Sequence, residues 1–496
     1  MTGGSTAHNL ADLVRAAAEH GAQHPALIDV AAGSELSWAR LDAAVSAEVE
    51  RLRGCGVAPG NRVAVRLPTG AAFCVAVFGA LRAGCVAVPL PPGAPSPDLR
   101  RVLTDSRAGV LVSEDHPSEV DITVIGPPAL VVGPVEPAPA VGGGDDLAVL
   151  AYTSGTSGNP RGVMLSHRAL LANVGQCAAL RPAPVTAADR VLLALPLFHV
   201  YGLGPGLLQV AAAGATAVLM DRFDPEQALA VIERHRVTTI VGVPQMYQAL
   251  LRLPAQRLRA GLATVRLLTS GAAPLEPALL QQVRTVTGLG VFEGYGLTET
   301  APVLTSTLVG GQPKPGSVGR PLPGVQVRLV DTDGQPLPSV VDVDEDASGT
   351  GLVAARGANL FSGYWPDGQH GPDAEGWFRT GDVGYFDSDG DLHLVARVND
   401  LIIVNGFNVY PHEVEKVLME HPAVAQAAAV GVPDPETGET VKAVLVLREG
   451  AVLTAEDVLA HCVSELARFK VPTVVEFVDA LPHTPTGKLA RARLRS

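Results

Sequence analysis

The segment "YTSGTSGNPRG", from Tyr152 to Gly162, combines residue types that bind phosphate oxygens, and it follows the apolar run "LAVLA" directly. Glycines let the backbone approach a ligand closely, and hydroxyls add donors to the exposed backbone N–H groups. Arg161 supplies a cation, but no Lys-Ser or Lys-Thr pair follows the last glycine, as a P-loop would require. Alone, the segment fits a polyphosphate loop and a polar surface turn equally well. Its candidate ligands are Thr153, Ser154, Gly155, Thr156, Ser157, Gly158 and Arg161.

The segment "GYGLTET" contains side chains suited to a base and to a hard cation. Tyr295 stands between Gly294 and Gly296, which gives an aromatic face on a tight turn. Thr298 and Glu299 offer oxygen ligands of the kind Mg²⁺ prefers. The alternative is a strand end followed by a helix cap, because Thr-Glu often opens helices.

Two more segments place a charged side chain on a turn. "GWFRTGD" ends at Asp382, whose carboxylate could accept both hydroxyls of a ribose, although an Asx turn explains it as well. Near the C-terminus, "LPHTPTGKLARARLRS" holds Lys488 behind Pro485 and Gly487 on a restrained loop, where a solvated tail lysine is the alternative.

Composition limits the class of protein. The 496 residues carry a net charge of −13, which argues against non-specific binding to nucleic acid. The five cysteines are isolated and form no metal-ligand spacing, which favours a reduced, metal-free thiol set in the cytoplasm.

The N-terminus has no basic region followed by an apolar core, so we expect no signal peptide. The apolar window "AAFCVAVFGALRAGCVAVPL" is interrupted by Arg82 and glycines, and we divide it into a buried helix and a strand.

The elements that must position these side chains follow from the hydrophobic pattern. Short apolar runs such as "RVAVRL", "RVLLALPL", "TTIVGVP" and "VRLLTSG" alternate with helical patterns such as "PEQALAVIERHR". This alternation predicts crossover units and largely parallel sheets covered by helices. Near residue 340 the strands are punctuated by Asp-Gly turns, which predicts an antiparallel or barrel-like subdomain. We place a domain boundary near Arg397 to Asp400, and the segment after it is predicted to form a small α+β domain of roughly 100 residues.

In this order, the four segments resemble the adenylate-forming superfamily of acyl-CoA synthetases, luciferases and peptide-synthetase adenylation domains. The resemblance covers nearly the whole chain and includes "LPLFHVYG", "TSGAAPL", "GSVGRPLPG" and "ARVNDLIIVNGFNVYPHEVE". It implies an α/β fold: a large N-terminal AMP-binding domain, 1–398, of two α/β sheet subdomains and a β-rich subdomain. A small, mobile α+β domain, 399–496, would follow it.

The resemblance also implies ATP, Mg²⁺ and CoA as ligands and a role for each site residue. Lys488 would bridge the substrate carboxylate and the α-phosphate, and Asp382 with Arg397 would hold the ribose. Asn399 would occupy a hinge whose rotation brings Gly406 to a pantetheine passage. The remaining assignments are Gly271, Ala272, Ala273, Gly294, Tyr295 and Gly296 for the base, Glu299 and Thr298 for the metal, and Lys488, Glu299 and His199 for catalysis.

The resemblance also bears on the acid that is activated, and the chain departs from the family pattern at three positions. Peptide-synthetase domains carry an aspartate at the position of His199, and malonate-activating relatives an arginine at that of Gly294, so a charged acid is disfavoured. "GFNVYP" is similar to fatty acyl-CoA ligases, and we predict a medium- or long-chain fatty acid, with an aryl acid second. Arg161 replaces a usual lysine, Asn399 an acidic or lysine hinge residue, and Ala396 a usual glycine.

Three other functions remained open. One is an acyl-AMP ligase that loads an acyl carrier protein, although no large insertion typical of that class is evident. Another is an aryl acid–CoA ligase. The third is a catalytically silent acyl- or nucleotide-binding protein, against which the presence of Glu299, Asp382, Arg397 and Lys488 argues. The sequence does not determine the oligomeric state or transient membrane contact, but the net negative charge disfavours docking on anionic lipid.

Overall fold

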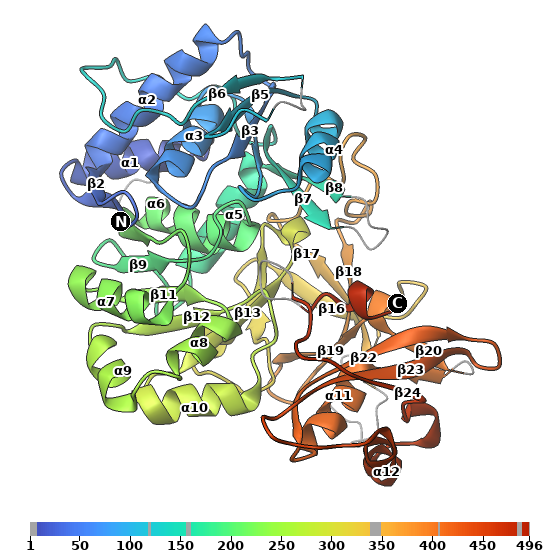
Figure 1. The fold of residues 1–496 in the computed structure, drawn as a ribbon. Helices are drawn as coiled ribbons and strands as arrows, with labels where there is room; N and C mark the ends of the chain where they lie inside the picture. Colours follow the sequence, from blue (N-terminus) through green and yellow to red (C-terminus); the bar gives the residue numbers. More distant parts are fainter. Residues whose placement is uncertain are drawn as a thin grey trace. The chain divides into compact units, whose positions relative to one another are not determined.

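A computed structural model describes residues 7–117, 121–154, 160–337, 349–404, 407–483 and 489–495 of the chain. Its internal contacts divide it into two compact units. Unit 1 contains Met1–Val327 and Ala355–Phe378, and unit 2 contains Arg328–Ala354 and Arg379–Ser496. Figure 1 follows the chain through both.

A nine-stranded sheet forms one half of unit 1. In order across the sheet, its strands are β15 (Arg320–Pro321), β14 (Val303–Ser306), β13 (Val291–Gly296), β12 (Leu267–Ser270), β11 (Thr239–Gly242), β9 (Arg190–Leu193), β10 (Thr216–Leu219), β1 (Pro25–Asp29) and β2 (Ser34–Ser37). The strands from β13 to β1 are parallel, and antiparallel strands flank them at both ends. Their carboxyl ends therefore meet at one edge, where ligands bind in open α/β sheets.

A six-stranded sheet forms the other half. Its order is β6 (Thr123–Ile125), β5 (Ala108–Ser113), β3 (Arg62–Arg66), β4 (Val86–Pro89), β7 (Leu147–Ser154) and β8 (Pro160–Ser166). The pairs from β6 to β7 are parallel, whereas β7 and β8 form an antiparallel hairpin. The two sheets confirm the predicted α/β architecture.

Helices between the sheets contact both of them. Helix α3 packs on β3 and β4 of one sheet and on β1 of the other, and α5 and the π-helix η1 extend this layer toward β7, β8 and β9. Every residue of α3 except Ala72 is buried, which explains its continuous apolar sequence. One hydrophobic cluster consequently runs from Leu10 to Phe361. The helices of unit 1 are α1 (Asp12–Gly21), α2 (Trp38–Gly54), α3 (Ala71–Arg82), α4 (Ser96–Ser106), α5 (His167–Ala178), η1 (Gly202–Leu208), α6 (Gln209–Ala213), α7 (Pro225–His235), α8 (Pro244–Leu250), α9 (Ala255–Gly261) and α10 (Pro277–Thr287), with short 3₁₀ turns η2 (Thr298–Thr300) and η3 (Thr307–Gly310).

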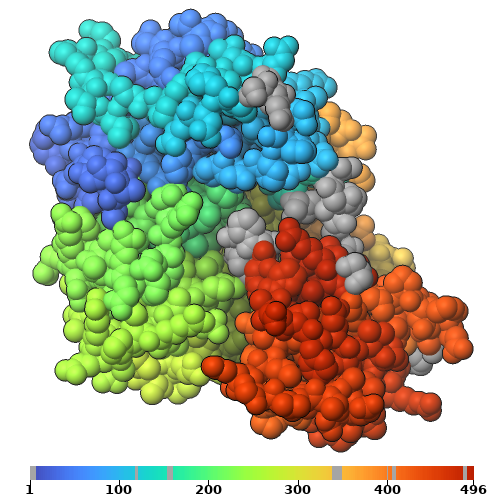
Figure 2. Space-filling view, in the orientation of Figure 1, coloured from blue at the N-terminus to red at the C-terminus, as the bar shows by residue number. Residues whose placement is uncertain are grey.

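Local sequence signals fix where several of these helices begin. Ser166 Oγ accepts a hydrogen bond from the Ala169 N–H at the start of α5, as N-cap serines do. Asp224 caps α7 in the same way and is followed by Pro225 at the first helical position. The outer surface of α7, α9 and α10 appears as a continuous green flank in Figure 2.

Unit 2 contains two smaller sheets. Most of the four-stranded sheet β16 (Gln326–Val330), β17 (Gly351–Arg356), β18 (Phe378–Phe386) and β19 (Leu392–Arg397) belongs to it. The antiparallel pair β18–β19 turns at Gly390, which has a positive φ and donates its N–H to the Asp387 carbonyl at 2.9 Å. The five-stranded sheet contains β21 (Phe407–Val409), β20 (Ile402–Val404), β23 (Gly438–Leu447), β22 (Val424–Asp434) and β24 (Val474–Phe477), accompanied by α11 (Pro411–Glu420), α12 (Ala455–Glu465) and the turns η4 (Val398–Asp400), η5 (Arg468–Lys470) and η6 (Arg491–Leu494).

These features confirm the large sheet-containing N-terminal part and the small α+β tail. The predicted helix and strand in the apolar window are α3 and β4. Within the described ranges, no helix combines the length and apolarity that a membrane crossing needs. The boundary between residues 398 and 399, and the mobility of the tail, stay predictions.

Buried His167 generates a prediction about acid stability. Its Nδ1 accepts the Leu10 N–H at 3.0 Å, and burial lowers the pKa of the imidazole to about 4. In the unfolded chain this imidazole is protonated below pH ~6.5, whereas in the folded chain it is protonated only below about pH 4. The free energy of unfolding therefore falls as the pH drops from 6.5 to 4. Relative to wild type, His167→Asn should show a flatter loss of unfolding free energy between pH 6.5 and 4 in chemical denaturation.

Exposed His116 offers the matched control. His116→Asn should keep the wild-type pH dependence, and a His167→Asn curve parallel to wild type would contradict the assignment.

Candidate functional site

The segment that was predicted to bind phosphate belongs to the β7–β8 hairpin. Thr153 pairs with Arg161 across the hairpin, and Ser154 pairs with Pro160. Gly155, Thr156, Ser157 and Gly158, together with the side chain of Ser154, lie outside the described residues. The described part places Arg161 at the base of the hairpin tip, where its side chain is exposed.

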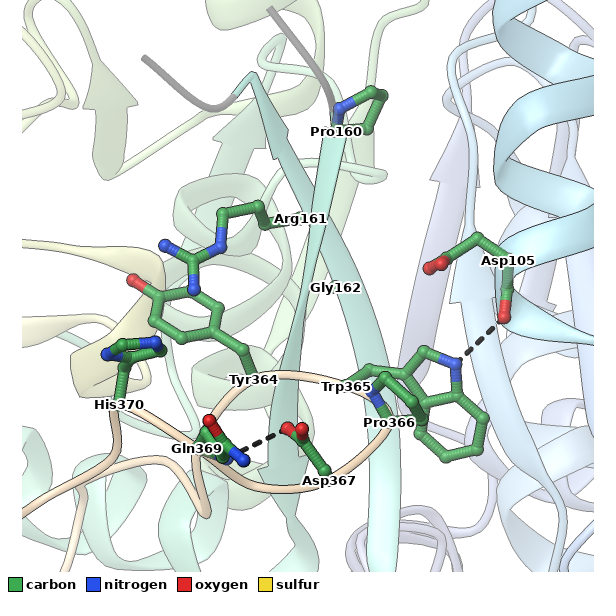
Figure 3. A pocket seen from close by; sticks show the side chains of 10 residues that line it. All are labelled: Asp105, Pro160, Arg161, Gly162, Tyr364, Trp365, Pro366, Asp367, Gln369 and His370. Atoms are coloured by element: carbon green, nitrogen blue, oxygen red, sulfur yellow. Dashed lines mark hydrogen bonds between the residues drawn. The ribbon is translucent and has the colours of Figure 1, made fainter. Parts of the chain in front are cut away.

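Arg161 is the first member of a three-residue cluster in unit 1. Its guanidinium carbon lies 3.9 Å from the ring centroid of Tyr364, within the range of a cation–π contact. The Tyr364 hydroxyl donates to Glu299 Oε1 at 2.7 Å. Burial, and then the Glu299 carboxylate, raise the pKa of Tyr364, so the phenol stays protonated and donates at neutral pH. Figure 3 shows the Arg161 side chain against the Tyr364 ring, with His370 and Gln369 nearby.

The backbone around Glu299 is held at several points. The Phe361 N–H donates to the Glu299 carbonyl at 2.9 Å, and Asn359 Nδ2 donates to the Thr300 carbonyl at 2.7 Å. Ala301 follows in the left-handed region at φ +61°, a conformation that costs an alanine about 1 kcal/mol. Contacts from another segment thus compensate the strain and fix the turn that carries the carboxylate.

Glu299 and Thr298 fit the predicted metal site by their chemistry. A carboxylate and a hydroxyl are the hard oxygen ligands that Mg²⁺ takes, usually one or two from protein, with phosphate oxygens and water completing the set. Tyr364 occupies Oε1, and Oε2 has no hydrogen-bond partner among the described residues. The turn therefore presents one carboxylate oxygen for a cation.

The loop Gly271–Ala273 follows β12 at the carboxyl edge of the parallel strands. Ala272 has φ +65°, which makes this a second strained turn near the site. Buried Glu293 on β13 supports the loop, because its Oε1 accepts the Leu275 N–H at 3.1 Å. Burial is the main reason that the pKa of Glu293 is raised to about 8.

The predicted base-stacking residues lie on β13. Tyr295 pairs with Thr305 of β14, and its side chain is 8% exposed. A Cβ on Gly296 would lie 1.7 Å from the Pro302 carbonyl oxygen, so only glycine fits there. Gly294 has no such obstacle: an added Cβ would make ordinary contacts at 3.4 Å or more.

His199 lies beyond the end of β9, next to a second tyrosine. Its Nδ1 accepts the Tyr201 N–H at 3.2 Å, and the Tyr201 hydroxyl donates to the Gly242 carbonyl at 3.3 Å. A Cβ on Gly271 would meet the Tyr201 ring at 2.9 Å. The Tyr201 ring therefore packs directly against the predicted base loop at Gly271.

Tyr247 closes the same region from α8. Its hydroxyl donates to the Thr269 carbonyl at 2.5 Å, and a Cβ on Gly242 would lie 2.7 Å from that hydroxyl. Burial raises the pKa of both phenols, Tyr201 and Tyr247, so both remain donors. Two glycines thus make room for two tyrosines at the ends of β11 and β12.

In unit 2, the structure brings together two predicted ribose ligands. Asp382 on β18 pairs with Arg397 on β19, and Arg397 Nε donates to Asp382 Oδ1 at 2.7 Å. Asp382 is 4% exposed, and its N–H donates to Thr380 Oγ1. Lys488, Gly406 and the side chain of Asn399 lie outside the described residues, so their roles stay predictions.

Three carboxylates at the β18–β19 turn do not form a second candidate metal site. Asp387, Asp389 and Asp391 lie close together, but Asp387 Oδ1 accepts the N–H groups of the other two at 3.0 Å each. Asp387 Oδ2 binds His393 Nε2 at 2.7 Å. The turn itself explains the cluster.

Sequence reasoning missed Tyr364, Tyr201 and Glu293. Tyr201 lies inside "LPLFHVYG", a motif whose family resemblance implies a role for His199 but none for its tyrosine. Glu293 directly precedes "GYGLTET". Its role could not be recognised from the sequence, because it accepts a hydrogen bond from the backbone N–H of Leu275, which any residue except proline would offer at that position.

Two protein-family models match most of the chain. The model of the AMP-binding enzyme family matches residues 13–365, and that of the AMP-binding enzyme C-terminal domain matches residues 413–488.

Individual relatives match over nearly their full length. Feruloyl-CoA synthase from Amycolatopsis sp. is 38% identical over 473 residues, covering 93% of this chain and 94% of that protein. A long-chain-fatty-acid–CoA ligase from Yersinia pestis is 32% identical, covering 98% and 94%. The crystal structure of ATP-bound MatB from Rhodopseudomonas palustris has a TM-score of 0.88 and 32% identity over 98% of each chain.

Glu293 generates a prediction about alkaline stability. The folded chain keeps its carboxyl protonated up to about pH 8, whereas the unfolded chain ionises it near 4.5. The contribution to stability is thus complete below pH 4.5 and is lost as the pH rises, at about 1.4 kcal/mol per pH unit, until about pH 8. Glu293→Gln keeps an acceptor oxygen for Leu275 and should remove this component between pH 5 and 8, measured by denaturant unfolding.

Neighbouring Glu276 is exposed and serves as the control. Glu276→Gln should retain most of the wild-type slope, and an unchanged slope in Glu293→Gln would refute the buried neutral carboxyl.

Proposed function

Because the chain belongs to the AMP-binding enzyme family, we propose that it is an ATP-dependent, AMP-forming ligase that joins an apolar carboxylic acid to CoA. The observation that carries the proposal is the cluster of Arg161, Tyr364 and Glu299, which combines a cation and a metal-type carboxylate at the β7–β8 hairpin. The ATP-bound relative of the same fold and the CoA-ligase names of the relatives support it.

The first step would be attack of the substrate carboxylate on the α-phosphorus of ATP, which forms a mixed anhydride and releases pyrophosphate. Two anions approach within a few ångströms, and their repulsion grows as water leaves the site. Arg161 would bind the outer phosphates, and Lys488 would lie between the carboxylate and the α-phosphate. Mg²⁺ held by Glu299 and Thr298 would supply charge neutralisation at the phosphates when bound.

No acid–base pair is required in this step, because the carboxylate is already ionised and pyrophosphate is a good leaving group. The side chains act by orientation and by fixed charge. Tyr295 would stack on adenine beside Gly271–Ala273, and the Asp382–Arg397 pair would bind the ribose. The second step would be attack of the CoA thiol on the anhydride, with release of AMP after rotation at Asn399 and entry past Gly406.

Two classes of acid are candidate substrates, fatty acids and aryl acids. The sequence predicted a medium- or long-chain fatty acid, and the relative named long-chain-fatty-acid–CoA ligase supports that choice. The packing of the Tyr201 ring against Gly271 and of the Tyr247 ring against Gly242 reduces the open space at the ends of β11 and β12, which we take to favour a short, flat aryl acid. The relative named feruloyl-CoA synthase agrees with the aryl candidate.

The first test follows both half-reactions with a panel of fatty and aryl acids. Pyrophosphate release with ATP and Mg²⁺, and thioester formation only when CoA is added, are the expected results. Lys488→Ala should lower pyrophosphate release at least 100-fold while ATP still binds, because the lysine acts on the transferred charge. Lys416→Ala, on α11, is the matched control.

The other outcomes decide between the remaining functions. Acyl-AMP that persists in the presence of CoA would indicate a ligase that loads a carrier protein. Unchanged turnover in Lys488→Ala would refute the role of the lysine, and ATP binding without pyrophosphate release by the wild type would indicate a silent binding protein.

A second prediction tests whether the Tyr201 ring limits the length of the acid. Tyr201→Ala removes the ring that fills the space next to Gly271, so kcat/KM for decanoate relative to that for ferulate should rise at least tenfold. A substitution that lowers both values equally would show that Tyr201 maintains the fold of the pocket without selecting the acid.

A further inference from the structure

Resting on the proposed function, we propose that Tyr364 is a positioning residue for adenylation. Its ring seats the guanidinium of Arg161 at the phosphate-binding hairpin, and its hydroxyl holds one oxygen of Glu299 so that the other faces Mg²⁺. A single side chain thereby fixes both the cation and the metal-binding carboxylate.

The position of Tyr364 is itself determined by the backbone of unit 1. Its N–H donates to the Gln369 carbonyl at 3.1 Å, and the Trp365 N–H donates to the Gly162 carbonyl at 2.8 Å. Phe361 packs edge-on against the ring at a centroid distance of 5.1 Å. The turn is anchored further by Trp365 Nε1, which donates to the Asp105 carbonyl at 2.8 Å (Figure 3). These contacts hold the ring in place without a ligand.

The stacking contact gives a reason for arginine at position 161. A planar guanidinium can lie on an aromatic face while its N–H groups point outward, whereas an ammonium is a compact point charge. Among the described residues, Arg161 has no hydrogen-bond or ion-pair partner, so its donors are available to an anion. The ring thus restrains the guanidinium before an anion binds, which reduces the conformational entropy that binding would otherwise cost.

The hydroxyl contact acts on Glu299 in a complementary way. A carboxylate on a turn can rotate about its last bond and offer either oxygen to a cation. The 2.7 Å hydrogen bond from Tyr364 engages Oε1, and the Phe361 N–H fixes the carbonyl of the same residue. Only Oε2 is then left for the metal, in one orientation.

The experiment separates the two contacts with two substitutions. Tyr364→Phe removes the hydroxyl and keeps the ring, whereas Tyr364→Leu removes both. ATP binding to the full-length protein is measured by calorimetry in EDTA and at increasing Mg²⁺, and the KM for ATP is taken from pyrophosphate release. Tyr385→Phe, an exposed tyrosine on β18, is the control.

We expect Tyr364→Phe to bind ATP normally in EDTA but to need about tenfold more Mg²⁺ for half-maximal tightening, the loss typical of one hydrogen bond to a charged group. Tyr364→Leu should weaken ATP binding in EDTA as well, by three- to tenfold. Arg161→Lys should produce that same loss in the wild-type background and little further loss in Tyr364→Leu, because the two residues act through one contact.

Three outcomes would contradict the proposed roles of Tyr364 or of the protein. A Mg²⁺ requirement in Tyr364→Phe equal to that of wild type overturns the role of the hydroxyl, and additive losses for Arg161→Lys and Tyr364→Leu overturn the role of the ring. Wild-type protein that binds no ATP under any condition overturns the proposed function together with this inference.

Discussion

Two contacts of Tyr364, a cation–π contact with Arg161 and a hydrogen bond to Glu299, join parts of unit 1 that lie far apart in the sequence. Arg161 comes from the six-stranded sheet, Glu299 from the turn after β13 of the nine-stranded sheet, and Tyr364 from the chain segment that pairs with β8. Backbone hydrogen bonds hold each of the three: the pairing of β7 and β8 holds Arg161, the Phe361 N–H holds the carbonyl of Glu299, and the Gln369 carbonyl holds the N–H of Tyr364. A cluster assembled in this way is preorganised, which is the condition under which electrostatic stabilisation is most effective.

Two alanines with positive φ lie in turns that carry predicted ligand-binding residues. Ala272 and Ala301 both have positive φ, and each turn is held by a polar side chain from a different segment, Glu293 in one case and Asn359 in the other. The Ala272 turn follows β12, and the Ala301 turn follows β13. Predicted ligand-binding residues lie in both turns. Among the described residues, no non-glycine residue inside a strand has a positive φ.

Much of the fold followed from periodicity. Alternating apolar strands and amphipathic helices predicted parallel sheets, and Asp-Gly turns predicted the hairpin of β18 and β19, because these patterns act locally. The site was only partly predictable. Arg161, Tyr295, Glu299 and Asp382 lie in segments with recognisable composition, whereas Tyr364 and Glu293 matter through partners 65 and 18 positions away in the chain. No local pattern reports such a pairing. The contacts of Tyr201 and Tyr247 were equally hidden, since they depend on which glycine backbone each ring meets.

The helical layer shared by the two sheets has a thermodynamic consequence. Because α3 is buried between β1 on one side and β3 and β4 on the other, neither sheet can lose its structure without exposing the same apolar surface. The two halves of unit 1 are therefore expected to unfold in a single cooperative transition. A nucleotide bound at the carboxyl edge of one sheet would then raise the melting temperature of both, by an amount that grows with the logarithm of its concentration above Kd.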